Sequence, residues 1–407
     1  MQRPAKPFTP VRFRLQPPNF MIPYGKQDIT ISDIKAVEKV LKSPMLTQGP
    51  LVPIFEDNLA QFCKSKYATA VNSATSGLHL ACLALGIKKG DIVWTSPITF
   101  VASANCALYC GADIDFIDID PHTYNISYEA LLKRLQGIKN KKEIPKLLIL
   151  VHLCGLPTQL KEINKLCKKY GIKIIEDASH ALGSKYENYV TGSCSFSDLT
   201  VFSFHPVKMI TTAEGGMITT NSKALDRKLK ALRTHGIYRP TSEKNSMPWF
   251  YDQKDLGFNY RMTDISAALG ISQLSRLSRF VKKRNKIAQI YKKELSNLPL
   301  KFQHIPQNTL SSYHLFVIQL DGKLEENKKK RLSLYKHLRK NGIFVNLHYM
   351  PVYKHTYYKN LKEFKFLKYA EDYYVRSISI PIFISLKKSE QEFVIHTIRN
   401  FFIEKSL

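Results

Sequence analysis

Apolar strand-like segments alternate with helix-like segments along the first half of the chain, and this order constrains the fold more than any other feature. Segments typical of buried strands lie at 67–71, 92–96, 114–120, 147–153 and 172–177. Between them, apolar residues recur with the spacing of a helix. Parallel strands need long crossover connections, which place helices against the faces of the sheet. The sequence therefore predicts an α/β fold with a mostly parallel central sheet and helices on both faces.

A second alternation of strand and helix follows a long helical stretch in the last third of the chain. Strands are predicted at 313–320 and 344–349, on either side of a lysine-rich helix at 326–340. The 407 residues are enough for two units of unequal size. We therefore expect a large domain at 21–265, and a long helix with a smaller C-terminal α/β domain at 266–407.

Charge and targeting signals narrow the class of protein. The formal net charge of +28 would suit a protein that binds polyanions, but the lysines occur as short pairs and triples without a nucleic-acid-binding motif. We therefore expect no nucleic-acid partner. No apolar run is long enough to cross a bilayer, so no membrane insertion is expected. Residues 1–20 are basic and proline-rich without the apolar core of a secretory signal, and we expect a loosely ordered extension.

The number and spacing of the cysteines bear on the redox state of the compartment in which the protein works. Seven cysteines are spread through the chain without a CxxC pair. This spacing argues against a disulfide framework and fits a reducing cytoplasm. It also lacks the four clustered ligands of a structural zinc site, so no metal is predicted.

Small polar residues stand where a predicted strand ends and a helix begins, in the segment NSATSGLHL at 72–80. The first turn of a helix presents unpaired N–H groups and partial positive charge, and a phosphate can bind there. The hydroxyls of Thr75 and Ser76 would be further donors. An ordinary helix cap has the same composition, so this segment alone leaves both interpretations open.

Asp177 follows the predicted strand 172–177 in the segment IIEDASHALG. Parallel sheets bind ligands at the carboxyl ends of their strands. A carboxylate there could pair with a protonated pyridine nitrogen and keep the ring an electron sink, or it could cap the next loop. His180 could be a packing residue, and Phe100 could stack on a ring or belong to the core.

Lys208 lies in SFHPVKMITTAEGG, on a predicted turn between two strands. An amine attacks an aldehyde only when unprotonated, and burial lowers the pKa of lysine toward neutrality. An anchor for phosphate, an acid for a ring nitrogen and an amine for an aldehyde are what pyridoxal 5′-phosphate requires. Together the three elements predict a site for this cofactor.

As a set, these motifs resemble the sugar aminotransferases of the DegT/DnrJ/EryC1/StrS family, within the fold-type-I pyridoxal-phosphate enzymes. The resemblance runs from about Tyr24 to near the C-terminus. The motifs that carry it are MLTQGP, NSATSGLHLACLALG, SPITFVASAN, EDASHALGS, FSFHPVKMITTAEGG, GFNYRMTDISAALGISQL and HYMPVY. It implies a large domain around a mostly parallel sheet, a smaller C-terminal α/β domain, and pyridoxal 5′-phosphate as cofactor.

The resemblance also implies roles for individual residues. Lys208 would bind the cofactor aldehyde covalently and then move the proton, Asp177 would pair with the pyridine nitrogen, and Phe100 would stack on the ring. His180 would take part in catalysis, and Glu214 would line the site. The further cofactor-binding residues would be Ala74, Thr75, Ser76, Ser203 and Asn259. The residues in contact with the sugar nucleotide would be Tyr24, Met45, Leu46, Thr47, His348 and Tyr349.

Because Asn259 would reach the phosphate bound by the neighbouring subunit, the resemblance implies a homodimer with shared active sites. The combination SHALGS and ITTAEGG, with His180 where many members have glutamine and Ala213 where many have glycine, resembles the subgroup of pseudaminic acid biosynthesis. That subgroup moves the amino group of L-glutamate to the C4 keto group of a UDP-linked 4-keto-6-deoxy-N-acetylhexosamine. The products would be UDP-4-amino-4,6-dideoxy-N-acetyl-β-L-altrosamine and 2-oxoglutarate.

Three other functions stay open at this stage. The chain could aminate a different nucleotide-linked keto sugar, at C3 or at another C4. It could be a pyridoxal-phosphate sugar dehydratase, although dehydrating relatives carry histidine where this chain has Lys208. It could also be a basic nucleic-acid-binding protein that retains an inactive scaffold.

Overall fold

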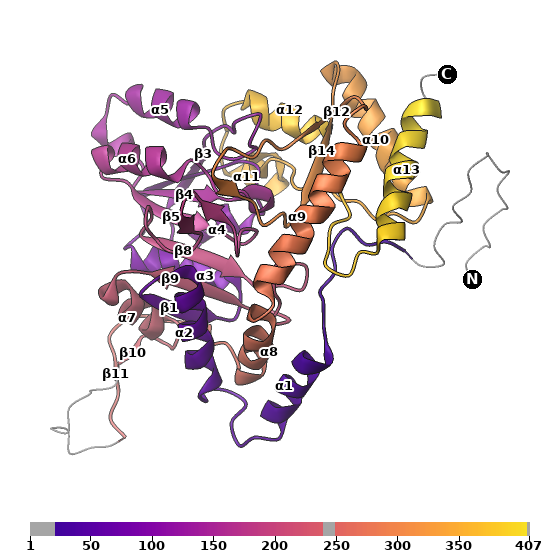
Figure 1. The fold of residues 1–407 in the computed structure, drawn as a ribbon. Helices are drawn as coiled ribbons and strands as arrows, with labels where there is room; N and C mark the ends of the chain where they lie inside the picture. The colour runs from indigo at the N-terminus through magenta and orange to yellow at the C-terminus, as the bar shows by residue number, and fades with distance from the viewer. Residues whose placement is uncertain (1–20, 239–248, 405–407) are drawn as a thin grey trace.

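The computed structural model describes residues 21–238 and 249–404 of the chain (Figure 1). The extension expected at 1–20 lies outside the described residues. A seven-stranded sheet in the order β1-β9-β8-β5-β4-β2-β3 forms the centre of the larger part. Its strands are β1 (Tyr67–Val71), β2 (Ile92–Thr95), β3 (Asp113–Phe116), β4 (Leu147–Val151), β5 (Lys173–Asp177), β8 (Leu199–Ser203) and β9 (Gly216–Thr220).

Strand direction confirms the predicted α/β fold. Strands β3, β2, β4, β5 and β8 are parallel to their neighbours, and only β9 pairs antiparallel, with β8 on one side and β1 on the other. The reversal follows from the chain connection, because β8 and β9 are joined by the turn at 204–215 rather than by a crossover helix. This turn carries Lys208.

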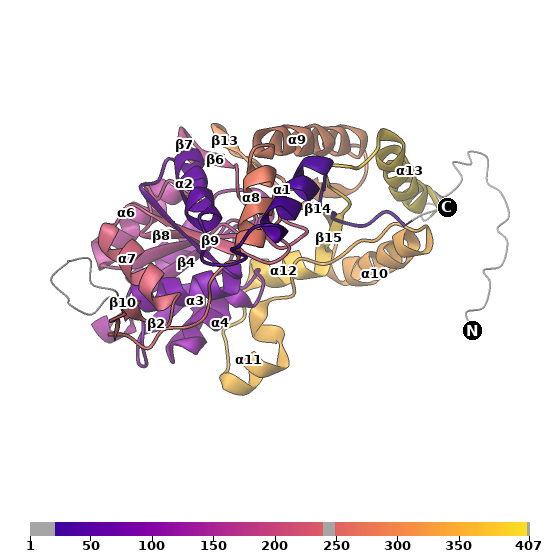
Figure 2. The same cartoon turned by 90° about the horizontal axis from the view of Figure 1, so that it is seen from below.

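Helices cover both faces of the sheet, as the buried side chains of β4 illustrate. Leu147 and Ile149 pack into the core beneath α3 and α4, whereas Leu148 and Leu150 pack on the other face with α5 and α6. Figure 2 shows α3 and α4 on one side of the central strands, and α2 and α8 on the other. These helices are α2 (Leu51–Cys63), α3 (Ala74–Ala84), α4 (Ala102–Tyr109), α5 (Tyr128–Gln136), α6 (Leu160–Tyr170), α7 (Lys223–Leu232) and α8 (Asp264–Leu274).

The C-terminal part contains a three-stranded antiparallel sheet in the order β12-β14-β15. Its elements are α9 (Leu277–Glu294), β12 (Leu300–Phe302), β14 (Phe316–Leu320), α10 (Leu324–Lys340), α12 (Lys368–Arg376), β15 (Ser377–Ile380) and α13 (Lys388–Glu404). The long α9 extends from the core of the larger part, where Phe280 packs, to the core of the smaller part, where Tyr291 packs (Figure 1). The expected boundaries of the two domains stay a prediction. Ile22, at the start of the described chain, belongs to the C-terminal core.

The strand predicted at 344–349 is wrong. Asn346 forms only an isolated bridge, to Ser379, and the third strand of the small sheet is β15. The physical reason is that residues 346–350 turn away from the sheet and line a cavity between the two parts. Val345 packs into the C-terminal core, and the five consecutive residues 346–350 line the cavity, so packing rather than a ladder holds this segment.

Shorter elements complete the described chain. They are α1 (Ile31–Leu41), α11 (Thr356–Leu361), β6 (Lys185–Tyr186), β7 (Tyr189–Val190), β10 (Ile237–Tyr238), β11 (Asp252–Gln253), β13 (Thr309–Leu310) and the 3₁₀ turns η1 (Lys141–Glu143), η2 (Leu153–Gly155) and η3 (Val352–Lys354). Within 21–238 and 249–404, no helix is both long and apolar enough to span a membrane.

Candidate active site

A cavity of about 830 Å³ opens where three neighbouring parallel strands end. Val151, Asp177 and Ser203 are the last residues of β4, β5 and β8, and all three line the cavity. Residues 346–350 of the C-terminal part close another side. This is the edge of a parallel sheet at which α/β proteins bind ligands. The cavity brings together these residues singled out from the sequence: Tyr24, Ala74, Thr75, Phe100, Asp177, His180, Ser203, Lys208, Glu214, His348 and Tyr349.

Lys208 occupies the turn between β8 and β9, where its backbone N–H donates to His205 O over 2.9 Å. Burial lowers the pKa of its amine from 10.5 to about 8, while the negative charge of Asp177 acts in the opposite direction. Among the described residues, no side chain forms a hydrogen bond or an ion pair with the amine. The amine is therefore partly unprotonated near neutral pH and free to react.

Asp177 is held by hydrogen bonds to both of its oxygens. Oδ1 accepts from the backbone N–H and the hydroxyl of Ser179, at 3.1 and 2.6 Å. Oδ2 accepts from the hydroxyl of Ser103 at 2.6 Å. Asp177 is only 6% exposed. An acceptor-only group fixed in this way can pair with a buried cation, such as a protonated ring nitrogen.

The start of α3 offers free backbone donors to the cavity. Ser73 caps the helix, with its hydroxyl oxygen accepting from Ser76 N at 3.1 Å. The N–H groups of Ala74 and Thr75 have no acceptor among the described residues and lie in the cavity wall. Gly216 makes this packing possible, because a Cβ there would lie 2.7 Å from the nitrogen of Ala74. Small residues thus leave an anion site at the helix terminus.

Histidines and tyrosines form the wall opposite α3. The hydroxyl of Tyr349 lies 3.2 Å from Nε2 of His180, and Nδ1 of His348 lies 2.8 Å from the hydroxyl of Ser379. Burial, and then the charge of Lys208, lowers the pKa of His348 to about 3. Burial, Lys208 and His348 also lower the pKa of His180 well below its usual value. Both rings are therefore neutral at physiological pH. Each can donate or accept a hydrogen bond with a ligand without bringing a positive charge into the cavity.

Phe100 is 58% exposed, although it is a large apolar residue. It lines the cavity, and its ring centroid lies 6.3 Å from that of Tyr349. The core position that the sequence left open for Phe100 is therefore wrong. An exposed ring in the same cavity as Asp177 can stack on a planar ligand.

Several residues expected at the site lie outside this cavity. The hydroxyl of Ser76 is buried within its own turn and bonds Asn72 Oδ1 at 2.6 Å. Asn259 is exposed, and its backbone pairs with Thr234. The exposed loop residues Met45, Leu46 and Thr47 are placed by a backbone bridge from Thr47 to Thr263.

Sequence reasoning missed Ser103 and His314. Ser103 lies within the motif SPITFVASAN, and its helical position three residues after Phe100 was the available signal. His314 comes from the C-terminal part, and its ring centroid lies 4.4 Å from that of His180. No local pattern marks it, because the contact depends on how the two parts of the chain pack.

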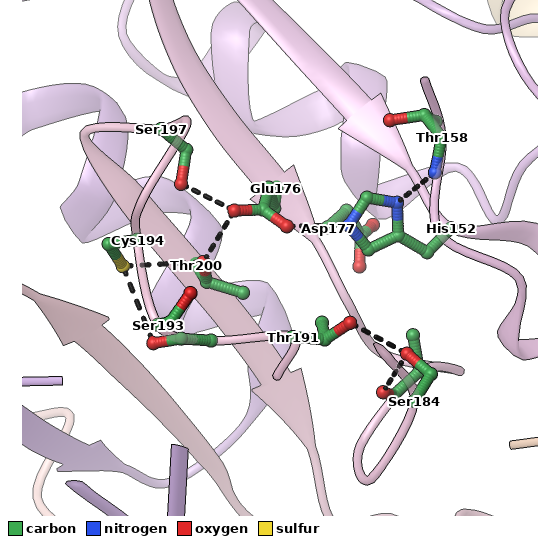
Figure 3. A network of polar contacts seen from close by, with 12 residues as sticks. His152, Thr158, Glu176, Asp177, Ser184, Thr191, Ser193, Cys194, Ser197 and Thr200 are labelled. Atoms are coloured by element: carbon green, nitrogen blue, oxygen red, sulfur yellow. Dashed lines mark hydrogen bonds and ion pairs between the residues drawn. The ribbon is translucent and has the colours of Figure 1, made fainter. Parts of the chain in front are cut away.

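A second polar network lies on the other side of β5 (Figure 3). Because successive residues of a strand point to opposite faces, Glu176 faces away from Asp177. It accepts hydrogen bonds from His152 Nε2 at 2.7 Å, Ser197 at 2.5 Å and Thr200 at 3.1 Å. This buried network anchors the strand that presents Asp177.

The cavity fits pyridoxal 5′-phosphate by the chemistry of its groups. The free N–H groups of Ala74 and Thr75 suit the phosphate, the fixed carboxylate of Asp177 suits the ring nitrogen, and the unpaired amine of Lys208 suits the aldehyde. Within the described residues, no group of three or more histidine, cysteine or acidic side chains is arranged to hold a metal ion.

Comparison with known sequences places the chain among sugar aminotransferases. Residues 27–399 match the DegT/DnrJ/EryC1/StrS aminotransferase family. The chain is 41% identical over 379 residues to the UDP-4-amino-4,6-dideoxy-N-acetyl-β-L-altrosamine transaminase of Campylobacter jejuni strain 81-176, and the alignment covers 93% of this chain and 96% of that protein. The Helicobacter pylori protein with the same name is 34% identical, with 92% and 96% covered.

Solved structures show the same architecture. Helicobacter pylori PseC, an aminotransferase involved in the biosynthesis of pseudaminic acid, superposes with a TM-score of 0.86 at 33% identity, over 94% of this chain and all of that one. The PLP form of the sugar aminotransferase Spr1654 of Streptococcus pneumoniae superposes with a TM-score of 0.85 at 29% identity, over 95% of this chain and all of that one.

Proposed function

This chain belongs to the DegT/DnrJ/EryC1/StrS aminotransferase family, and from that premise we propose a specific reaction for it. It is a pyridoxal-phosphate-dependent sugar aminotransferase of fold type I. Its reaction moves the amino group of L-glutamate to the C4 keto group of a UDP-linked 4-keto-6-deoxy-N-acetylhexosamine. The product is UDP-4-amino-4,6-dideoxy-N-acetyl-β-L-altrosamine. The name of the Campylobacter jejuni relative, aligned over nearly the whole of both chains, supports this substrate.

One observation carries the proposal. A single cavity contains the free amine of Lys208, the fixed carboxylate of Asp177 and the unpaired N–H groups at the start of α3. Each of these features has an ordinary structural explanation by itself. Their convergence on one cavity suits a phosphorylated aromatic aldehyde and few other ligands.

The cofactor, when bound, supplies an aldehyde and a ring that withdraws electrons from the substrate Cα. Ala74 and Thr75 would hold its phosphate, with Ser203 in the same cavity, Phe100 would stack on its ring, and Asp177 would pair with its ring nitrogen. Nζ of Lys208 accepts the proton from the glutamate Cα, because its lowered pKa leaves it partly unprotonated near neutral pH. The same nitrogen later returns a proton to the sugar at C4.

The neutral histidines and tyrosines of the opposite wall orient the sugar nucleotide. Tyr24, His348 and Tyr349 line the cavity next to Phe100 and offer rings and hydroxyls for a sugar and a base. His180 bonds Tyr349, and we assign it to positioning that hydroxyl. Glu214 lines the same cavity, and we assign its carboxylate to contact with the substrates.

We also propose that the active unit is a homodimer in the cytoplasm. Met45, Leu46, Thr47 and Asn259 are exposed outside the cavity of their own chain, which suits contacts with the site of a neighbouring subunit. Helix α1, which precedes Met45 in the chain, adds the exposed apolar residues Ile31, Ile34 and Leu41. The seven cysteines are free thiols, a pattern that suits a reducing compartment.

The test is product identification. Purified enzyme is incubated with L-glutamate and a panel of UDP-linked keto sugars that differ in the position of the ketone and in the configuration of the ring. NMR of the product then gives the aminated carbon and its stereochemistry. We expect amination at C4 of the 4-keto sugar that yields the altrosamine product. Preferred amination at C3, or of a different 4-keto sugar, would contradict the proposal. The Bacillus subtilis relative, the spore coat polysaccharide biosynthesis protein SpsC, at 33% identity, justifies including other sugars.

A further inference from the structure

A cluster of three cysteines and a histidine lies between α3 and α4. Its residues belong to the middle and C-terminal turns of the two helices, not to the first turns that border the cavity. His79 and Cys82 are three residues apart on α3, and Cys106 and Cys110 are four residues apart along α4 and its C-cap. Each pair therefore shares one face of its helix. The two helices pack against each other, as Figure 2 shows. Cys82 and Cys106 belong to one apolar core, and Cys110 packs against it.

Cys110 differs from the other six cysteines in its exposure. Those six are buried, whereas Cys110 is partly exposed at the end of α4. His79 flanks it on the α3 side, with its ring centroid 5.5 Å from that of Tyr109. A small reagent in solution can therefore reach Cys110, while the thiol of Cys82 lies behind it in the core.

The surroundings also favour the thiolate of Cys110. A hydrogen bond from the thiol of Cys82 lowers the pKa of Cys110, burial acts against this, and contact with His79 lowers the pKa further. Burial raises the pKa of Cys63, Cys154 and Cys194 instead. The thiolate is the form that reacts with oxidants, so the cysteine that solvent reaches is also the reactive one.

We propose that Cys110 is a site of modification by peroxide and that Cys82 is the thiol that resolves it. The Cys110 thiolate attacks one oxygen of hydrogen peroxide, the O–O bond breaks, and the sulfur becomes a sulfenic acid. The other oxygen leaves as hydroxide, which takes up the proton that the thiol had released and becomes water. The Cys82 sulfur then attacks the Cys110 sulfur, the S–O bond breaks and a second water leaves. Two thiols thereby lose two electrons and two protons to one peroxide, and a disulfide joins α3 to α4.

Helix geometry selects Cys82 over Cys106 as the partner. Residues four apart on a helix hold their Cβ atoms about 5–6 Å apart, and a disulfide requires about 3.5–4.5 Å. Cys106 and Cys110 therefore cannot join without unwinding the end of α4. Cys82 lies on the neighbouring helix α3, which packs against α4, and the core that contains Cys82 is the one against which Cys110 packs.

A chymotryptic peptide map tests this pairing, because cleavage after Tyr109 separates Cys106 from Cys110. The reduced holoenzyme is titrated with hydrogen peroxide, free thiols are alkylated, and the protein is digested without reductant. We expect a peptide pair linked through Cys82 and Cys110 that dithiothreitol separates. In unoxidised enzyme, Cys110 should be alkylated before any other cysteine. Retention of both thiols at peroxide levels that oxidise free cysteine, or a linkage through Cys106, would overturn the proposal.

Variants test the two roles separately. Cys110→Ser should form no linkage, and Cys82→Ser should stop at a sulfenic acid on Cys110 that dimedone labels. Cys167→Ser, which removes a buried cysteine on α6, is the matched control and should form the linkage as wild type does. A linkage that persists in Cys110→Ser contradicts the proposal. The wild-type map decides the pairing even if a variant fails to fold.

Discussion

The hydroxyl of Ser103 donates a hydrogen bond of 2.6 Å to Oδ2 of Asp177 and so connects helix α4 to the end of strand β5. The oxygen of Ser103 lies 2.7 Å from the hydroxyl of Thr99. Because the only proton of Ser103 goes to the carboxylate, Thr99 must be the donor in that second contact. A chain of two hydroxyls therefore sets the direction in which Asp177 faces the cavity.

Ser103→Ala should lower kcat/KM without unfolding the protein. It removes one hydrogen bond to a charged acceptor, and such a bond typically contributes about 1.5–3 kcal/mol. A loss of this size corresponds to a roughly ten- to hundredfold lower kcat/KM. Asp177→Asn should cost more, since it removes the charge itself. Steady-state kinetics at saturating cofactor measures both. Ser222→Ala, which removes only the N-cap of α7, should lose stability but keep kcat/KM. A Ser103→Ala enzyme with wild-type kinetics would mean that Asp177 needs no such support.

Lys208→Met should raise the melting temperature of the cofactor-free protein at pH 7. Burial lowers the pKa of Lys208 from 10.5 to about 8, so below pH 8 the folded state bears the full cost of a desolvated ammonium that the unfolded state does not. Between pH 8 and 10.5 the folded lysine loses its proton first, and wild type gains stability relative to the variant. The difference in melting temperature should therefore shrink over that range.

Calorimetry of both apo proteins from pH 7 to pH 10 measures this trend. Lys282→Met, at an exposed position on α9, is the control and should show no such dependence. The Lys208→Met variant should also fail to attach pyridoxal phosphate covalently, as read by absorbance after borohydride treatment. A difference that is constant with pH would show that Lys208 is well hydrated in the apo protein.

The sequence was most informative where local patterns determine the structure. The buried strands, the helices on both faces and the turn that carries Lys208 follow from period and turn composition, which act over a few residues. The strand predicted at 344–349 failed because only Asn346 pairs with the small sheet, while residues 346–350 line a cavity between the two parts, which local sequence does not mark. Ser103 and His314 were missed because their partners, Asp177 and His180, are brought to them only by the packing of distant segments.

Glu176→Gln should destabilise the protein by about 1–3 kcal/mol, since three hydrogen bonds to a charged acceptor become neutral ones. Burial raises the pKa of Glu176, but hydrogen bonding and charge from His152, with hydrogen bonds from Ser197 and Thr200, bring it below the usual 4.5. A carboxylate with a lowered pKa stabilises the fold above its usual value, and this contribution is lost as the pH falls through the folded value.

Urea unfolding at several pH values measures this contribution. The gap between wild type and Glu176→Gln should be constant from pH 6 to pH 8 and should narrow below about pH 4.5. Because Glu176 faces away from the cavity, the folded variant should keep kcat/KM near that of wild type. A large loss of activity at unchanged stability would instead place Glu176 in the chemistry.

Mixed dimers of Lys208→Ala and Asn259→Ala should regain activity that neither variant has alone. If Asn259 serves the neighbouring subunit, the site on the Asn259→Ala chain combines its own Lys208 with the Asn259 of its partner and is complete. The other site lacks both groups, so each hybrid dimer has one working site. If Asn259 serves its own chain, every site in the hybrid lacks one group and no activity returns.

The hybrids are made by unfolding and refolding an equal mixture of the two variants that carry different affinity tags, followed by tandem purification. The measurement is the rate of glutamate-dependent amination per hybrid dimer. A mixture of Lys208→Ala with Asp177→Asn is the matched control and should stay inactive, because both residues line the cavity of one chain. Recovered activity in the Asn259 hybrid alone would establish the shared site, since the exposed position of Asn259 outside its own cavity leaves no other route to complementation.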